Sequence, residues 1–89
     1  MPIIKSAKKR MRQNTRRRSR NRMRRSTLRT SIRRLHEAIE EGNSDAIQSQ
    51  WVETQGLIDR TARLGIIHRN TAARTKSRLA RRIHLASAG

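Results

Sequence analysis

The amino-acid sequence predicts an all-α protein, an up-down-up three-helix bundle with a long, overhanging Arg-rich first helix. Three observations lead to this fold class. Apolar residues recur at helical spacing in three segments, the only proline stands at position 2, and no run of β-branched or aromatic residues alternates as in a strand. We expect residues 1–89 to form a single domain, with residues 1–20 as a basic arm that projects from the bundle.

The first helix is expected at residues 5–41. Its apolar residues follow the spacing i, i+4, i+7 and i+11 and lie in its second half: Leu28, Ile32, Leu35 and Ile39. Gly42 follows an acidic helix end, and Asn43-Ser44-Asp45 offers an N-cap to the next helix.

The second and third helices are expected at residues 44–64 and 68–86. The apolar face of the second helix comprises Ile47, Trp51, Ile58 and Ala62. Trp51 is therefore predicted to pack in the core, and Gly56, unusual inside a helix, is expected to permit close helix contact. Gly65 has the position of a glycine after a helix C-terminus. The apolar face of the third helix comprises Ala72, Leu79, Ile83 and Ala86.

The helix lengths predict an overhang, because two short links make neighbouring helices antiparallel. The second helix would cover the first only back to about residue 21, which leaves roughly sixteen residues, about 24 Å, without a partner. The first and third helices would end side by side. We therefore expect Glu37 and Glu40 to lie near Arg81, Arg82 or His84.

Charge divides the chain into three blocks. Residues 1–34 hold fifteen Lys or Arg and no acid, residues 35–59 hold all six acids and no Lys or Arg, and residues 60–89 hold eight basic residues and no acid. A net charge of +17 on 89 residues predicts a polyanionic partner, with nucleic acid as the leading candidate. The acids indicate the face turned away from that partner, and we expect Asp59 and Arg60 to form an ion pair within the fold.

The basic arm has charges on all sides of its predicted helix. Such a rod fits between several phosphate backbones, which favours folded RNA over one groove of duplex DNA. A membrane-surface helix would keep an apolar face, and the arm lacks one. Because its like charges repel at i, i+4, we predict an arm that is mostly disordered in the free protein and helical when bound.

Several function classes find no support in the sequence. There is no Cys, the spacing of His36, His68 and His84 is not that of metal ligands, and no acid or hydroxyl residue stands in a catalytic arrangement. No apolar run approaches the roughly 20 residues of a membrane span. The sequence therefore predicts no enzyme, no metal site, no cofactor, no small-molecule substrate and no membrane partner.

Three motifs give a more specific indication. The first is Ile4-Lys5-Ser6-Ala7-Lys8-Lys9-Arg10. The second comprises Asn21, Arg24-Arg25-Ser26, Arg29-Thr30 and Ile32-Arg33-Arg34. The third comprises Ile58-Asp59-Arg60, Gly65-Ile66-Ile67-His68-Arg69-Asn70 and Ala72-Ala73-Arg74-Thr75-Lys76-Ser77-Arg78-Leu79. Together they resemble the bacterial small-subunit ribosomal protein family numbered twenty, over residues 4 to about 80 and without a gap.

The resemblance implies a three-helix bundle and a cytoplasmic place in the ribosome. It implies direct binding to 16S ribosomal RNA, in its 5′ domain and the penultimate stem near the 3′ end, beside other small-subunit components early in assembly. The RNA-binding residues it implies are Lys5, Ser6, Lys8, Lys9, Arg10, Arg24, Arg25, Arg29, His68, Arg69, Asn70, Arg74, Lys76 and Arg78. The charge density of the arm adds Arg12, Arg16, Arg17 and Arg18. The alternative is a generic DNA-binding or nucleoid-type basic protein. For His68, a hydrogen bond at the start of the third helix is an equally good interpretation.

Overall fold

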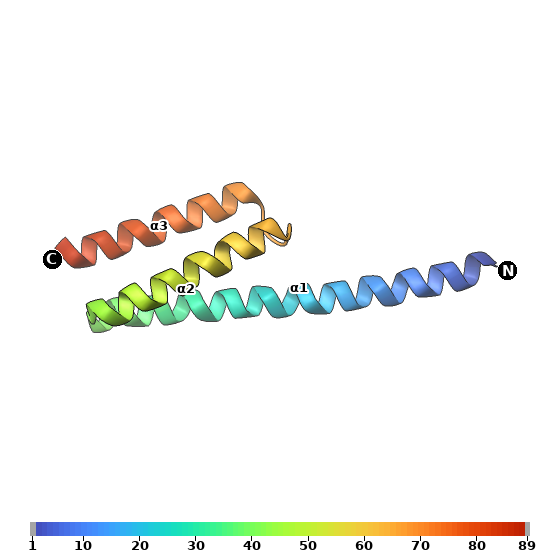
Figure 1. Ribbon diagram of the computed structural model, residues 1–89, viewed down its shortest axis with the longest axis horizontal. Coiled ribbons are helices and arrows are strands. Elements are labelled where there is room, and N and C mark those ends of the chain that lie inside the picture. Colours follow the sequence, from blue (N-terminus) through green and yellow to red (C-terminus); the bar gives the residue numbers. More distant parts are fainter. Residues whose placement is uncertain (1, 89) are drawn as a thin grey trace.

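The computed structural model describes residues 2–88 and consists of three α-helices (Figure 1). α1 spans Pro2–Glu41, α2 spans Ser44–Arg63 and α3 spans Arg69–Ala88. α2 runs antiparallel to α1, and α3 turns back to run in the direction of α1 (Figure 1). The predicted all-α fold is confirmed, and the helix bounds differ from the expected ones by no more than a few residues.

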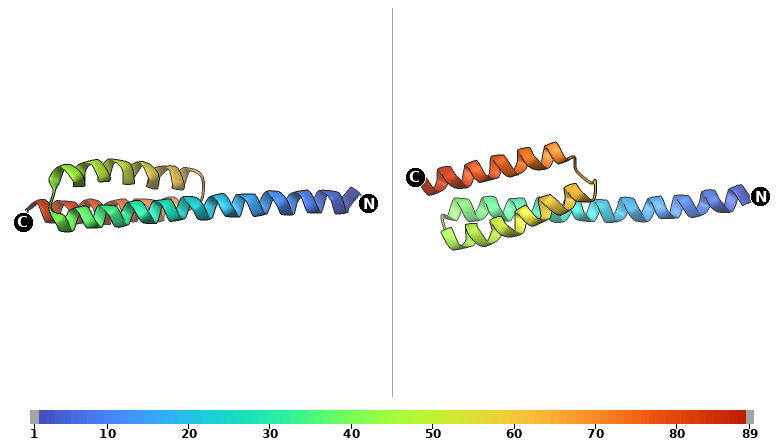
Figure 2. Two further views of the ribbon diagram at one scale, coloured as in Figure 1. Left: turned by 90° about the horizontal axis from the view of Figure 1, so that it is seen from below. Right: turned by 45° about the horizontal axis from the view of Figure 1, so that its top comes forward.

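The bundle is held mainly by the contact between α1 and α2, while α3 packs chiefly against α2 and has little contact with α1. In both views of Figure 2 the three helices run side by side at one end, and the first part of α1 extends beyond the other two. The core is aliphatic and small. Its buried apolar side chains are Leu28, Leu35, Ala38, Ile47, Ile58, Ala72 and Leu79. Leu35 and Ile58 have no exposed surface at all and form its centre. Trp51 is half-buried and packs against this core, as predicted.

Both links between helices have local signals that end one helix and start the next. Gly42 has φ +73° and its N–H donates to the carbonyls of Ala38 and Ile39. The side chain of Asn43 then accepts hydrogen bonds from the N–H groups of Asp45 (3.1 Å) and Ala46 (3.2 Å), which confirms the predicted N-cap.

The end of α2 is a Schellman motif. Gly65 has φ +75°, its N–H donates to the Ala62 carbonyl, and the Ile66 N–H donates to the Thr61 carbonyl. Ile66 itself is buried, with 8 % of its surface exposed. The turn between α2 and α3 is thus fixed by backbone hydrogen bonds and by a buried side chain, so that the start of α3 has a defined position.

A buried polar cluster lies inside the α1–α2 contact. The hydroxyls of Ser31 and Thr54 are 2.8 Å apart, and Thr54 has no exposed surface. The Gln50 side-chain N–H group donates to the Ser31 hydroxyl (3.0 Å) and to the Ser31 carbonyl (3.2 Å). Apolar periodicity did not indicate these residues. Because a buried polar group is costly unless it is paired, the cluster favours one register of α2 on α1.

The expected ion pairs between the ends of α1 and α3 are wrong. Among the side chains of residues 6–87, which the structure describes, the only ion pair joins Lys76 Nζ and Asp59 Oδ1, at 2.9 Å. Glu37 and Glu40 are unpaired because α3 packs on α2 and has little contact with α1. Asp59 does not pair with Arg60 either, since consecutive residues of a helix do not face each other.

The prediction for Gly56 is also wrong. This residue is exposed, and a Cβ atom built on it would meet no atom within 4 Å. No helix approaches it closely, so packing does not require glycine at this position.

The arm is continuous with the packed part of α1 and extends far beyond α2 and α3 (Figure 1). Because of this arm, the three helices together measure 68 × 22 × 14 Å. The arm is helical in the structure from Pro2 onward, where the sequence predicted disorder in the free protein. Arg and Lys are good helix formers, and the packed second half of α1 supplies a nucleus from which the helix extends. The free-state disorder stays a prediction that a solution measurement tests.

Candidate nucleic-acid interface

The arm forms the first part of the candidate interface. All side chains from Ser6 to Arg20 are exposed, and they include every predicted arm residue except Lys5, whose side chain lies outside the described part. The predicted contacts Ser6, Lys8, Lys9, Arg10, Arg12, Arg16, Arg17 and Arg18 all lie here. Nothing in residues 6–20 packs on another helix, so these side chains are free to meet a ligand from any direction.

A second part lies where α2 ends beside α1. The hollow at this point has a volume of about 580 Å³, and the residues that line it are Arg18, Asn21, Arg22, Arg25 and Arg29. They recur at helical spacing on one face of α1, which explains why they come together. Three of them were predicted; Asn21 and Arg22 were not predicted as contacts, although the i, i+4 pair formed by residues 18 and 22 is visible in the sequence.

Arg25 has a structural role besides its charge. Its Nη2 group donates a hydrogen bond of 3.5 Å to the carbonyl of Ile66, in the turn between α2 and α3. Asn21 is the first side chain from Ser6 onward that is partly buried. The side chain of Arg25 therefore links α1 to this turn at the point where the arm leaves the bundle.

The start of α3 forms the third part. His68 Nδ1 accepts a hydrogen bond of 3.0 Å from the Asn70 N–H, so His68 caps the helix. Arg69, Asn70, Arg74 and Arg78 are exposed. The backbone N–H groups and the dipole at a helix start favour an anion, which suits the Arg residues around them.

Lys76 differs from the other predicted residues of α3. Its Nζ group pairs with Asp59 of α2 at 2.9 Å, and 36 % of its side chain is exposed, against 50 % for Asp59. This pair is one of the few links between α3 and α2 outside the core. A phosphate would have to compete with the carboxylate of Asp59 for Lys76.

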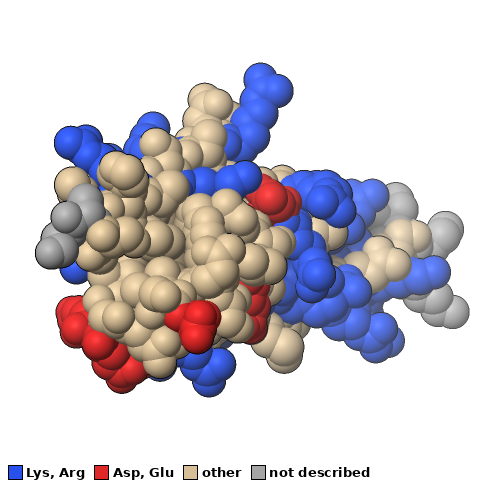
Figure 3. All heavy atoms as spheres, turned by 60° about the vertical axis from the view of Figure 1, so that its left-hand side comes forward, with Lys and Arg blue, Asp and Glu red and all other residues tan. Residues whose placement is uncertain are grey.

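The three parts of the candidate interface lie on the arm and at the end of the bundle from which the arm emerges. The turn between α2 and α3, with the start of α3, lies at the end of the bundle from which the arm emerges (Figure 1). Acidic side chains gather at the opposite end, others lie further along the bundle, and Lys and Arg cover the arm behind it (Figure 3). The structure thus brings the start of α3 and the arginines at positions 24–29 to the same end of the bundle, and it leaves residues 6–18 far out on the arm.

Two further features of the described residues bear on function. Between residues 2 and 88 no helix is long and apolar enough to cross a membrane. In the same part of the chain no group of three or more His, Cys, Asp or Glu side chains is placed to hold a metal ion.

Comparison with known proteins gives a consistent match. The sequence model of the family described as Ribosomal protein S20 matches residues 2–84. The chain is similar to the small ribosomal subunit protein bS20 of Yersinia pestis, with 46 % identity over 84 residues that cover 94 % of this chain and 97 % of the relative. It is 41 % identical to bS20 of Shouchella clausii over 88 residues, 99 % and 100 % of the two chains. It is 40 % identical to bS20 of Halothermothrix orenii over 84 residues, 94 % and 97 %.

Proposed function

The chain belongs to the ribosomal protein S20 family, whose members are structural components of the small ribosomal subunit rather than enzymes, and we propose that it binds folded 16S ribosomal RNA directly. In this proposal the protein works in the ribosome and bridges RNA helices during assembly. The RNA regions are the 5′ domain and the penultimate stem near the 3′ end. The protein contributes positioning and charge, and it turns over no substrate.

The observation that carries the proposal is the arm without a packing partner. Residues 6–20 are exposed on every side, and the whole segment 1–34 contains no acid. A helix of this kind gains nothing from its own bundle, because it buries no apolar face. Phosphate groups offset its repulsion from all directions, and they do so best where several RNA backbones surround the rod.

The separation of the proposed interface into distant parts supports bridging. The outer arm, around residues 6–18, extends away from the bundle, while the start of α3 and Arg24, Arg25 and Arg29 lie at the bundle itself. About nineteen residues of α1 precede Asn21, which at 1.5 Å per residue separates the arm tip from the bundle by about 28 Å. One RNA helix on the outer arm and another on the bundle would then be held at a fixed distance.

The test of bridging uses two separate RNA fragments, the 5′ domain and the penultimate stem, each added to the full-length protein. Native mass spectrometry is expected to detect a complex of one protein with one copy of each fragment. A variant with Arg16, Arg17 and Arg18 changed to Gln should lose one fragment, and a variant with Arg69, Arg74 and Arg78 changed to Gln should lose the other. If the two fragments displace each other from the unmodified protein, the bridging proposal is wrong.

A further inference from the structure

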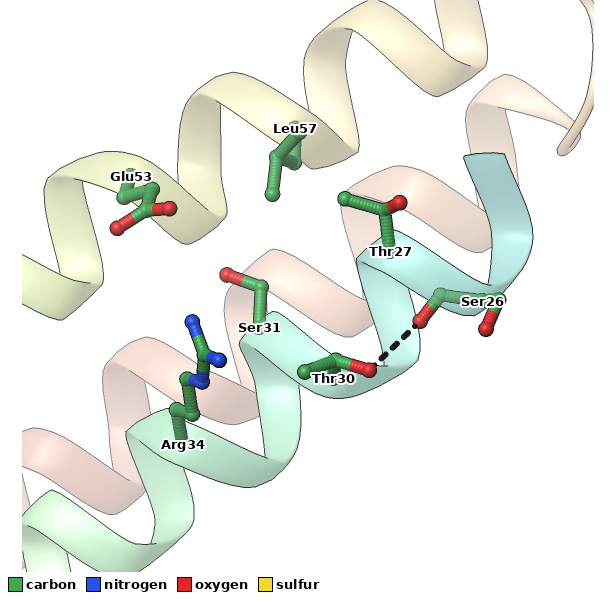
Figure 4. A pocket seen from close by; sticks show the side chains of 7 residues that line it. All are labelled: Ser26, Thr27, Thr30, Ser31, Arg34, Glu53 and Leu57. Atoms are coloured by element: carbon green, nitrogen blue, oxygen red, sulfur yellow. Dashed lines mark hydrogen bonds between the residues drawn. The ribbon is translucent and has the colours of Figure 1, made fainter. Parts of the chain in front are cut away.

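A groove follows the contact between α1 and α2. In the view of Figure 4 the groove faces the reader and α3 lies behind α1 and α2. It consists of two hollows of about 260 Å³ and about 200 Å³. Both are lined by Thr27 of α1 and Leu57 of α2, so they form one continuous surface. Arg24 and Arg60 line one end, and Arg34 and Glu53 line the other. From Arg24 to Arg34 the groove follows α1 for about 15 Å.

The end of the groove nearer the arm is basic and unpaired. Arg24 and Arg60 come from different helices, and both are exposed. Neither has a carboxylate partner, because the one ion pair among the described residues joins Lys76 and Asp59. Two guanidinium groups on facing walls can take the same phosphate or two successive phosphates, each with paired N–H donors.

The middle of the groove suits a sugar rather than a charge. The Thr27 hydroxyl donates to the Met23 carbonyl at 3.0 Å, which leaves its oxygen free to accept a hydrogen bond. Leu57 is half-buried and supplies an apolar surface beside it. A ribose fits both features, since its 2′-hydroxyl can donate to the Thr27 oxygen and its ring carbons can pack on Leu57.

The end of the groove farther from the arm determines which way a sugar–phosphate segment would lie in it. Glu53 and Arg34 lie on facing walls there (Figure 4), so the carboxylate lowers the positive potential of that end. A phosphate is therefore favoured between Arg24 and Arg60 and disfavoured beside Glu53. The groove has one anionic subsite followed by a hydroxyl-accepting, apolar subsite.

We propose that this α1–α2 groove is an additional RNA-binding site, which takes a sugar–phosphate segment with its phosphate between Arg24 and Arg60 and its 2′-hydroxyl on Thr27. The site rests on the proposed function and extends it, because it assigns RNA contacts to Arg60 and Thr27 and to a face of α2. The arm and the start of α3 are separate from this face. The bundle then meets RNA on the open side of α1 and α2 as well.

The first test compares Arg60→Gln with Arg63→Gln in binding to folded small-subunit RNA over a series of salt concentrations. Both variants lose one charge near the end of α2, but only Arg60 lines the groove. Arg60→Gln is expected to weaken binding about tenfold. It should also make the slope of log K against log salt shallower by about 0.7 to 0.9, the value for one phosphate contact. Equal small effects of the two variants would overturn the proposal.

An arm variant with Arg16, Arg17 and Arg18 changed to Gln separates this site from the proposed function. If the arm variant loses affinity and Arg60→Gln does not, the groove proposal alone is wrong. If neither variant changes RNA affinity, direct RNA binding by the basic surface is wrong as well.

A second readout uses the absence of cysteine from the chain. Ser26 lines the groove, and a Ser26→Cys variant can carry an iron chelate that cleaves nearby nucleic-acid backbone. The matched position is Ser44→Cys, at the opposite, acidic end of the bundle. The probe at position 26 is expected to give a short, defined set of cuts in the bound RNA that the probe at position 44 does not give. Identical cutting patterns, or no cuts from position 26, would contradict the proposal.

Discussion

Replacement of Thr54 by Val is expected to destabilise the protein by about 1–3 kcal/mol, although the two side chains have nearly the same shape. Thr54 has no exposed surface, and its hydroxyl lies 2.8 Å from that of Ser31. Valine removes this partner and leaves a buried Ser31 hydroxyl with one hydrogen bond fewer. The cost arises from the hydrogen bond that the buried Ser31 hydroxyl loses, since it then keeps only the one from the Gln50 side chain (3.0 Å), rather than from lost packing.

The loss of stability in each variant depends on which hydrogen bonds remain after the substitution. In Ser31→Ala, the Thr54 hydroxyl can still donate to the Ser31 carbonyl, which is 3.4 Å away, so this variant should lose only about 1 kcal/mol. In the double variant no hydroxyl is left unpaired, and Gln50 keeps its hydrogen bond to the same carbonyl at 3.2 Å. The double variant should therefore lose less than the sum of the single variants, by about 0.5–1.5 kcal/mol.

Urea unfolding followed by far-UV circular dichroism measures all three free energies of unfolding. The exposed Thr71→Val substitution is the control and should stay within about 0.5 kcal/mol of the unmodified protein. A loss of 1 kcal/mol should also lower Tm by about 4–8 °C in a domain of this size. Additive effects of Ser31→Ala and Thr54→Val would refute the reasoning, because they would mean that the two hydroxyls do not depend on each other.

Three other predictions concern the ends and the exposed parts of the helices. The eight basic i, i+4 pairs between residues 5 and 33 each cost about 0.2–0.5 kcal/mol. The free protein should therefore gain helical circular dichroism as salt rises or RNA is added, and nearly full helix at low salt would contradict this. His68→Ala should destabilise the protein by about 0.5–1 kcal/mol because it removes the cap of α3, and His68→Asn should restore most of that loss in urea unfolding. Gly56→Ala should stabilise the protein by about 0.5–1 kcal/mol in the same assay, since Gly56 is exposed and has no close neighbour; a destabilised variant would show that glycine is required there.

The helices follow closely from the sequence because their signals are local. The apolar spacing of Leu28 and Leu35 identified the buried face of α1, and Gly42, Asn43 and Gly65 marked the links. These residues act within one or two helical turns, where backbone geometry and hydrogen bonding decide the outcome. The overhang also follows, since it depends only on helix lengths and short links.

The errors involve contacts between helices. Nothing in a periodic pattern says that α3 packs chiefly on α2, so the pairing of Glu37 or Glu40 with the end of α3 was expected and is not found. A buried Thr54 has the same sequence signature as an exposed one, and only the facing Ser31 gives it a partner.

The candidate interface was only partly visible in the sequence. Charge alone indicates the arm, because residues 1–34 contain no acid to pair with. The groove depends on the register of α2 against α1, which places Arg60 across from Arg24, and the sequence does not contain that register. The cap made by His68 was one of two open interpretations, and the structure shows its hydrogen bond to Asn70.

The central claim is that this protein binds folded ribosomal RNA specifically rather than any polyanion. The most direct test is competition at near-physiological salt between folded small-subunit RNA and duplex DNA of equal length. We expect the RNA to be preferred by a factor of about 1000 or more, as for specific over non-specific binding. Equal competition by the DNA, with the same steep salt dependence, would contradict the claim and leave only a generic polyanion-binding protein.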